Sequence, residues 1–202
     1  MRFRALTAVS ALTALTFLGT VPMAQAAGPS ASAAGTMVKI QKLTPEMTRA
    51  IDAARAKAAP SGSALQAAHV LCYQAHTRKA GWTAQLCTDG AAGFTGTTGH
   101  NDPIDMVAFT VFGGLDFNTQ FHWANDGTSI GFNVPADGRR IEFWNLSGNP
   151  LEAIRLRSTN ETMKAAAHVQ NVGWKGTDQW SYDQWIGSIG EARWMEAFWV
   201  AI

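Results

Sequence analysis

The stretch AAAHVQNVGW, residues 165–174, places a histidine six residues before a tryptophan, with a glycine directly before the tryptophan. The same pattern occurs as YQAHTRKAGW at residues 73–82 and, without the tryptophan, as TQFHWANDGT at residues 119–128. Both conserved positions of the pattern recur with a period of 46 residues: His76, His122 and His168, and Gly81, Gly127 and Gly173. Two residue types that share one period indicate an internal repeat.

Each repeat also ends in an apolar segment. These segments are IDMVAFTV at residues 104–111, PLEAIRLR at 150–157 and WMEAFWVAI at 194–202. Aligning them on Ala108, Ala153 and Ala197 gives separations of 45 and 44 residues, so the loops differ slightly in length. We expect three units, at about 66–111, 112–158 and 159–202.

From about residue 67 onward, short apolar runs alternate with glycine, asparagine and aspartate, which is typical of many short strands and not of helices. A unit of about 46 residues cannot bury its apolar face alone, but three units around one axis can share a core. The sequence therefore predicts an all-β, pseudo-threefold repeat domain. It is β-trefoil-like or β-prism-like; unit length slightly favours the trefoil, and the choice stays open.

The N-terminal part differs in composition. Residues 1–26 have two arginines, an apolar run and a small-residue end, which is typical of an export signal. Residues 27–65 are predicted to be a linker containing a short helix near 44–59, with Thr44 as N-cap and Pro45 in the first turn. We expect a secreted protein, extracellular or associated with the cell surface, without a membrane span after the signal is removed.

Charge and cysteine content narrow the possible partners and compartment. The formal net charge is +1 and lysine and arginine form no dense cluster, which argues against a nucleic-acid partner. The chain has two cysteines, Cys72 and Cys87, and in an oxidising compartment we expect them to form a disulfide.

The segments CYQAHTRKAGW, GTTG and DMVAF of the first unit, and AHVQNVGW with WMEAF of the third, resemble the clostridial hydrophobic repeat with tryptophan (ChW). The resemblance covers about residues 67–202, and the middle unit fits through its spacing and its closing PLEAIRLR. It implies a secreted or surface-associated bacterial protein with a role in adhesion or polysaccharide binding. It carries no catalytic motif.

The repeated histidines allow two interpretations. Around a threefold axis they could share a metal ion, as imidazole nitrogens do. Alternatively, each donates a hydrogen bond to a backbone carbonyl and fixes its strand to the following turn. We favour the structural role, because no carboxylate or thiolate recurs beside them at the same period, and we therefore expect no metal and no cofactor.

An enzyme is the least favoured class. Asp102, Asp105, Glu152 and Glu196 are the available acids or bases, but the two glutamates lie within apolar segments at a repeated position, which indicates a structural role. Known nucleophile motifs are absent from the sequence. We predict no catalytic residues.

We predict a non-enzymatic binding module for cell-wall or extracellular polysaccharide, in which repeated weak sites gain avidity on a polymer. The expected ligand-binding residues are an aromatic platform, the polar residues before it and the glycine-rich turn: Trp82, Trp174, Lys79, Asn171, Gly96 and Gly99. The alternative is a protein-binding or protease-inhibitor scaffold that displays the segment NVPADGRRIEFWNLSGN, residues 133–149, as a long loop.

Overall fold

The computed structural model describes residues 35–41, 45, 48–49, 52, 69–88 and 93–202. The expected export signal and most of the expected linker and helix lie outside these residues, but residues 36–41 of the expected linker form a strand that pairs with residues 140–145. The described strands are β1 (Thr36–Gln41), β2 (Val70–Thr77), β3 (Gly81–Trp82), β4 (Leu86–Cys87), β5 (Thr95–Gly96), β6 (Ile104–Phe112), β7 (Phe117–Trp123), β8 (Gly127–Thr128), β9 (Phe132–Val134), β10 (Arg140–Asn145), β11 (Leu151–Ser158), β12 (Lys164–Val169), β13 (Gly173–Gly176), β14 (Asp183–Gly187) and β15 (Met195–Ala201). The all-β prediction is confirmed.

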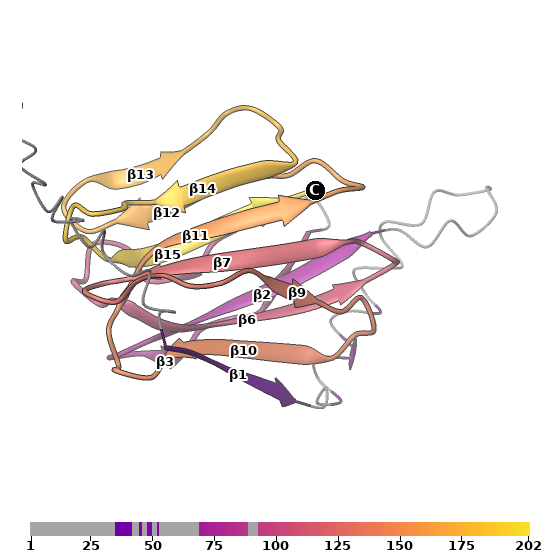
Figure 1. The fold of residues 1–202 in the computed structure, drawn as a ribbon, viewed down its shortest axis with the longest axis horizontal. Helices are drawn as coiled ribbons and strands as arrows, with labels where there is room; N and C mark the ends of the chain where they lie inside the picture. The colour runs from indigo at the N-terminus through magenta and orange to yellow at the C-terminus, as the bar shows by residue number, and fades with distance from the viewer. Residues whose placement is uncertain (1–34, 42–44, 46–47, 50–51, 53–68, 89–92) are drawn as a thin grey trace, which may run out of the picture. The chain divides into compact units, whose positions relative to one another are not determined.

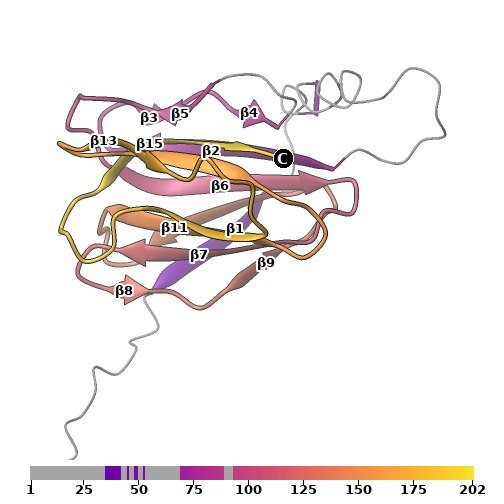
Figure 2. The same cartoon turned by 90° about the horizontal axis from the view of Figure 1, so that it is seen from above.

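Three antiparallel sheets contain these strands (Figures 1 and 2). The six-stranded sheet has the order β1-β10-β6-β2-β3, and β4 also pairs with β2. The five-stranded sheet has the order β14-β11-β7-β8, and β9 also pairs with β7. The four-stranded sheet has the order β13-β12-β15-β5. In each sheet, two long antiparallel strands lie in the middle.

The sequence of β7, FNTQFHW, shows why these segments form half-buried strands. Its odd-numbered side chains are buried and its even-numbered ones are partly exposed, the period of two that a strand with one covered face requires. Asn118, Gln120 and His122 therefore lie on the outer face of the five-stranded sheet.

The larger of two hydrophobic clusters in the described residues contains side chains from all three sheets. Phe109 of the six-stranded sheet contacts Phe117 of the five-stranded sheet, with ring centroids 5.2 Å apart, and Phe198 of the four-stranded sheet at 6.3 Å. Phe121 and Phe143 make a closer contact, at 4.9 Å. All five rings are almost fully inaccessible to solvent. Phenylalanine pairs of this kind contribute about 0.5–1.5 kcal/mol beyond the area that they bury.

Each sheet also contains a strand from a distant part of the sequence. β5 pairs with β15, β10 pairs with β6, and β14 pairs with β11. The prediction that residues 133–149 form a displayed loop is wrong, because this segment contains β10. Ile141 and Phe143 of β10 are buried core residues, so alternating apolar side chains place this strand inside the sheet.

The pairing register corrects the alignment of the three closing segments. His122 lies opposite Ala153 and His168 opposite Ala197, but His76 lies opposite Met106. Ala108 lies opposite Gln74 instead. The first closing segment is therefore shifted by two residues relative to the alanine alignment.

The predicted disulfide between Cys72 and Cys87 is present and links β2 to β4, opposite one another in the sheet. The two cysteines are 15 residues apart. Among the described residues, no helix has the length and hydrophobicity needed to cross a bilayer.

Replacing both cysteines, in a Cys72→Ala, Cys87→Ala variant, is expected to lower the free energy of unfolding by about 3 kcal/mol, the entropy contribution of a closed loop of this length. Urea denaturation monitored by tryptophan fluorescence measures the difference. Adding a reductant should destabilise the original protein and leave the double variant unchanged. Equal stability of the two oxidised proteins would contradict a stabilising role for this bond.

Candidate functional site

Each repeated histidine lies beside a carboxylate of the neighbouring strand. The three ring-nitrogen to carboxylate-oxygen distances are 2.6 Å for His76–Asp105, 3.4 Å for His122–Glu152 and 3.0 Å for His168–Glu196. An ionised carboxylate can only accept a hydrogen bond, so the ring nitrogen that faces it carries a proton. The expectation that each histidine bonds to a backbone carbonyl is wrong, and carboxylates do recur beside the histidines.

The carboxylate of the His122–Glu152 pair is affected by its burial. Glu152 is almost completely buried, and this burial raises its pKa above the ordinary value for a glutamate. The charge of His122 and a backbone hydrogen bond from Gly190 lower the same pKa, but they do not offset the effect of burial. Removing both groups from water costs free energy that offsets their attraction, so a buried pair of this kind adds little net stability.

The turn after each histidine depends on its glycine. Gly81, Gly127 and Gly173 have φ angles of +76°, +78° and +90°, in the left-handed region that residues with a Cβ rarely occupy. The turn brings the next residue back opposite the histidine in the hairpin. There the Trp82 ring meets the His76 ring edge-on at 5.2 Å, and Trp174 meets His168 in the same way at 5.5 Å. In the middle hairpin, Oγ1 of Thr128 lies 2.9 Å from Nδ1 of His122.

The two tryptophans have different surroundings. The guanidinium carbon of Arg140 lies 4.2 Å from the centre of the Trp82 ring, a cation–π contact. Arg140 also forms an ion pair with Glu142 at 3.0 Å and is buried itself. Trp174, in contrast, is 44% exposed.

Trp174 has an aromatic neighbour. Its ring contacts the Phe94 ring at 5.4 Å, and Phe94 is 46% exposed. Phe94 directly precedes β5, while Trp174 lies on β13 at the opposite edge of the same sheet. In the register of the sheet, His168 of β12 and Ala197 of β15 lie between Trp174 and Gly96.

The glycine-rich turn at residues 96–99 meets the His168–Glu196 pair. Gly96 lies opposite Ala197, and the backbone nitrogen of Gly99 donates a hydrogen bond to Oε2 of Glu196 at 3.1 Å. Two of the predicted ligand-binding residues, Gly96 and Gly99, are thereby brought to the site of Trp174. Phe94, His168 and Glu196 complete this site.

The predicted polar ligand-binding residues lie on the hairpin turns. Lys79 is exposed; its backbone nitrogen donates to Asp102 at 2.8 Å and its Nζ donates to the carbonyl of His100 at 3.2 Å. Asn171 is exposed and has a φ angle of +58°. Neither contacts the tryptophan of its own hairpin through a hydrogen bond within the described structure.

Sequence reasoning missed Phe94 and Arg140, each of which contacts one of the two tryptophans. Both are distant in sequence from the tryptophan that they contact, so no local spacing indicates them. In the part of the chain that the structure describes, no three histidine, cysteine, aspartate or glutamate side chains gather in a way that could hold a metal ion. No known protein family, curated protein or solved structure matches this chain.

The close approach of the chain at the glycine-rich turns can be measured with two neighbouring substitutions. A Cβ at Gly187 would lie 2.3 Å from the carbonyl oxygen of Glu152, whereas a Cβ at Gly190 would meet no atom within 4 Å. Both glycines have positive φ angles. We expect Gly190→Ala to cost about 1–2 kcal/mol from backbone strain alone, and Gly187→Ala roughly 1–3 kcal/mol more from overpacking.

Chemical denaturation of the two variants gives both values, and Gly190→Ala serves as the control for backbone strain. If the two substitutions destabilise the protein equally, the added Cβ at position 187 is accommodated without cost. That result would contradict the close packing described for Gly187.

Proposed function

We propose that this protein is a secreted, non-enzymatic module that binds extracellular or cell-surface polysaccharide through the Trp174 site. One observation carries the proposal: Trp174 and Phe94 expose nearly half of their surface beside the hydrogen-bonded His168–Glu196 pair. Adjoining exposed apolar side chains on a soluble domain mark interaction sites. A sugar ring offers apolar C–H faces to aromatic rings and hydroxyl groups to charged neighbours.

The polar half of the site is held in place before any ligand arrives. Glu196 is almost completely buried and receives hydrogen bonds from the ring of His168 and the backbone of Gly99. Fixed partners reduce the entropy that binding would otherwise cost. The buried carboxylate therefore orients the partly exposed imidazole of His168, which is the polar group beside the aromatic rings that a polyol could reach.

The surroundings of the other two histidine pairs are less suited to ligand binding. Arg140 covers Trp82, and Thr128 replaces the tryptophan beside His122. A sugar ring would have to displace Arg140 from both Trp82 and Glu142 to stack in the first unit. We therefore assign the expected Trp82 position a structural role and place polysaccharide binding at Trp174.

We propose further that residues 66–202 are three ChW-like units around a pseudo-threefold axis, closer to a β-prism than to a β-trefoil. The sheet connections support this arrangement. Each of the three sheets contains the first and last long strand of one unit, and each receives a strand from another unit. Three separate sheets with one shared core are the expected features of a prism.

Secretion is part of the same proposal. It is supported by the apolar N-terminal segment of the sequence and by the Cys72–Cys87 disulfide, since such bonds persist in oxidising compartments.

Trp174→Ala is expected to weaken retention on insoluble cell-wall polysaccharide on the order of tenfold or more, because it removes the larger ring of the platform. Phe94→Ala should act in the same direction. Binding is measured by pull-down with purified cell-wall glycan, and circular dichroism checks that each variant keeps its fold.

Trp82→Ala is the matched control, because it removes a tryptophan from the same hairpin position in another sheet. We expect retention of this variant to stay within about twofold of the original protein. If the original protein is not retained by any glycan of a broad panel, or if Trp82→Ala and Trp174→Ala weaken binding equally, the assignment of the site to Trp174 is wrong.

A further inference from the structure

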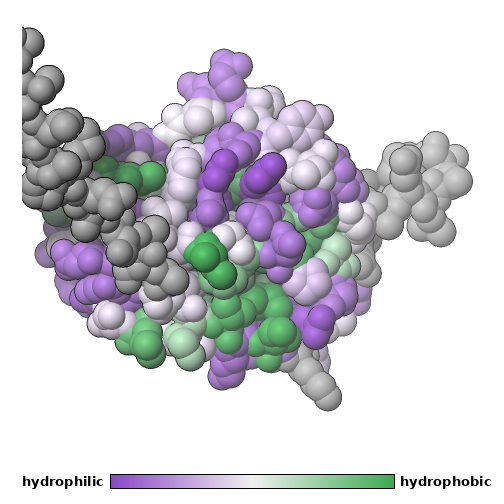
Figure 3. Space-filling model, viewed as in Figure 1, coloured by the Kyte–Doolittle hydropathy of each residue, from purple (hydrophilic) through white to green (hydrophobic). Residues whose placement is uncertain are grey.

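A second surface with different chemistry lies on the outer face of the five-stranded sheet. Neighbouring strands place Asn133, Asn118, Arg157 and Asp183 opposite one another in a row. Figure 3 shows hydrophilic side chains gathered over β7 and β11. An open hollow with an empty volume of about 420 Å³ lies at this end of the sheet, lined by Asp116, Asn118, Asn133, Arg157, Ser158 and Thr159.

The side chain of Arg157 is available in this hollow. Its neighbour Asp183 is held by the Arg155 guanidinium, with Nε at 2.7 Å from Oδ1 and Nη2 at 2.5 Å from Oδ2. The carboxylate of Asp116 accepts a hydrogen bond from Thr159. Arg157 is exposed and makes no hydrogen bond or ion pair with any residue that the structure describes. Its charge only helps to lower the pKa of Asp183 from a distance.

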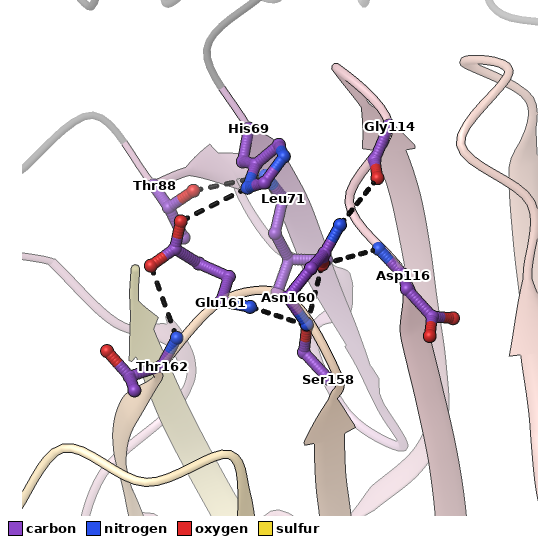
Figure 4. A network of polar contacts seen from close by, with 9 residues as sticks. All are labelled: His69, Leu71, Thr88, Gly114, Asp116, Ser158, Asn160, Glu161 and Thr162. Atoms are coloured by element: carbon purple, nitrogen blue, oxygen red, sulfur yellow. Dashed lines mark hydrogen bonds and ion pairs between the residues drawn. The ribbon is translucent and has the colours of Figure 1, made fainter.

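The wall of the hollow is fixed by a hydrogen-bond network (Figure 4). The side chain of Asn160 accepts from the backbone nitrogen of Asp116 at 3.0 Å and donates to the carbonyl of Gly114 at 2.9 Å. The hydroxyl of Ser158 accepts from the backbone nitrogen of Glu161 at 3.1 Å. These bonds tie the end of β11 to the turn before β7, so Arg157 and Asp116 project from a supported frame.

The two asparagines add neutral hydrogen-bonding groups. Nδ2 of Asn118 donates to Oδ1 of Asn133 at 2.8 Å. This bond orients both amides and leaves the Oδ1 of Asn118 and the Nδ2 of Asn133 to face other partners. Amide, hydroxyl and carboxylate groups together can bind several hydroxyls of one small ligand.

We propose that this hollow binds an acidic saccharide unit. Arg157 binds the sugar carboxylate through a bidentate hydrogen-bonded contact, the geometry for which a guanidinium is suited. The asparagine amides and the carboxylate of Asp116 form hydrogen bonds with the hydroxyl groups. The site lies on a different sheet from Trp174 and uses none of its residues, so it extends the proposed function without depending on it.

The residues that line the hollow argue against other classes of anionic ligand. No aromatic or large apolar side chain lines the hollow, so it offers no surface for a nucleobase or an acyl chain. Asp116 repels a ligand with several negative charges. A single carboxylate on a hydroxyl-rich ring satisfies both conditions, with its charged end at Arg157 and its hydroxyls toward Asp116.

Isothermal titration of the full chain with a uronic acid disaccharide tests this proposal. We expect saturable binding, and Arg157→Gln should weaken it about tenfold or more, because it removes a charge-assisted contact. Arg139→Gln removes the same charge from an exposed arginine that pairs with Asp137 outside the hollow, and should change affinity less than about twofold. Trp174→Ala should leave uronate binding unchanged, which separates this site from the polysaccharide site.

Three results would overturn the proposal. The first is no uronate binding by the original protein. The second is equal loss in Arg157→Gln and Arg139→Gln, which would show attraction by net charge alone. The third is equal affinity for a neutral disaccharide or for inorganic phosphate, since the former needs no arginine and the latter needs no hydroxyl groups.

Discussion

Main-chain pairing between distant segments is the constraint on which the structure depends. β5 closes against β15, β14 against β11 and β10 against β6, so no sheet is complete without a strand from another part of the chain. At Gly96 and Gly187 the two backbones approach so closely that a Cβ would lie 2.3 Å from a carbonyl oxygen of the partner strand. The same approach carries the backbone of Gly99 to the carboxylate of Glu196. The pairing of β5 with β15 therefore also brings the glycine-rich turn to the Trp174 site.

Much of this arrangement could be predicted from the sequence. Alternating apolar residues indicated strands because a half-buried strand has a period of two. The period shared by the histidines and glycines is explained by the hairpins, since the glycine must adopt a positive φ angle for the following residue to lie opposite the histidine. The disulfide followed from having only two cysteines, both in one segment, in a chain whose sequence predicts export.

The carboxylate partners could not be predicted in the same way. Glu152 and Glu196 directly precede an alanine, but Asp105 is three residues before Ala108, and only the pairing of His76 with Met106 shows that the three acids are equivalent. Phe94 and Arg140 were missed for a related reason. They reach the tryptophans from distant parts of the chain, and the sequence does not indicate which strands pair across such distances. The different surroundings of Trp82 and Trp174 therefore arise from tertiary contacts and not from the local motif.

Differences among the outer faces of the three sheets affect how the proposed polysaccharide binding would work. Equivalent sites on a rigid body raise avidity only for a ligand that repeats one chemical unit. Here the outer faces differ: the Trp174 face is aromatic, Arg140 covers the Trp82 face, and the β7–β11 face is polar around Arg157. A polymer of identical neutral sugars would engage one of them well. A polymer that alternates neutral and acidic sugars could engage two faces at once, and its specificity would come from the differences between the repeats.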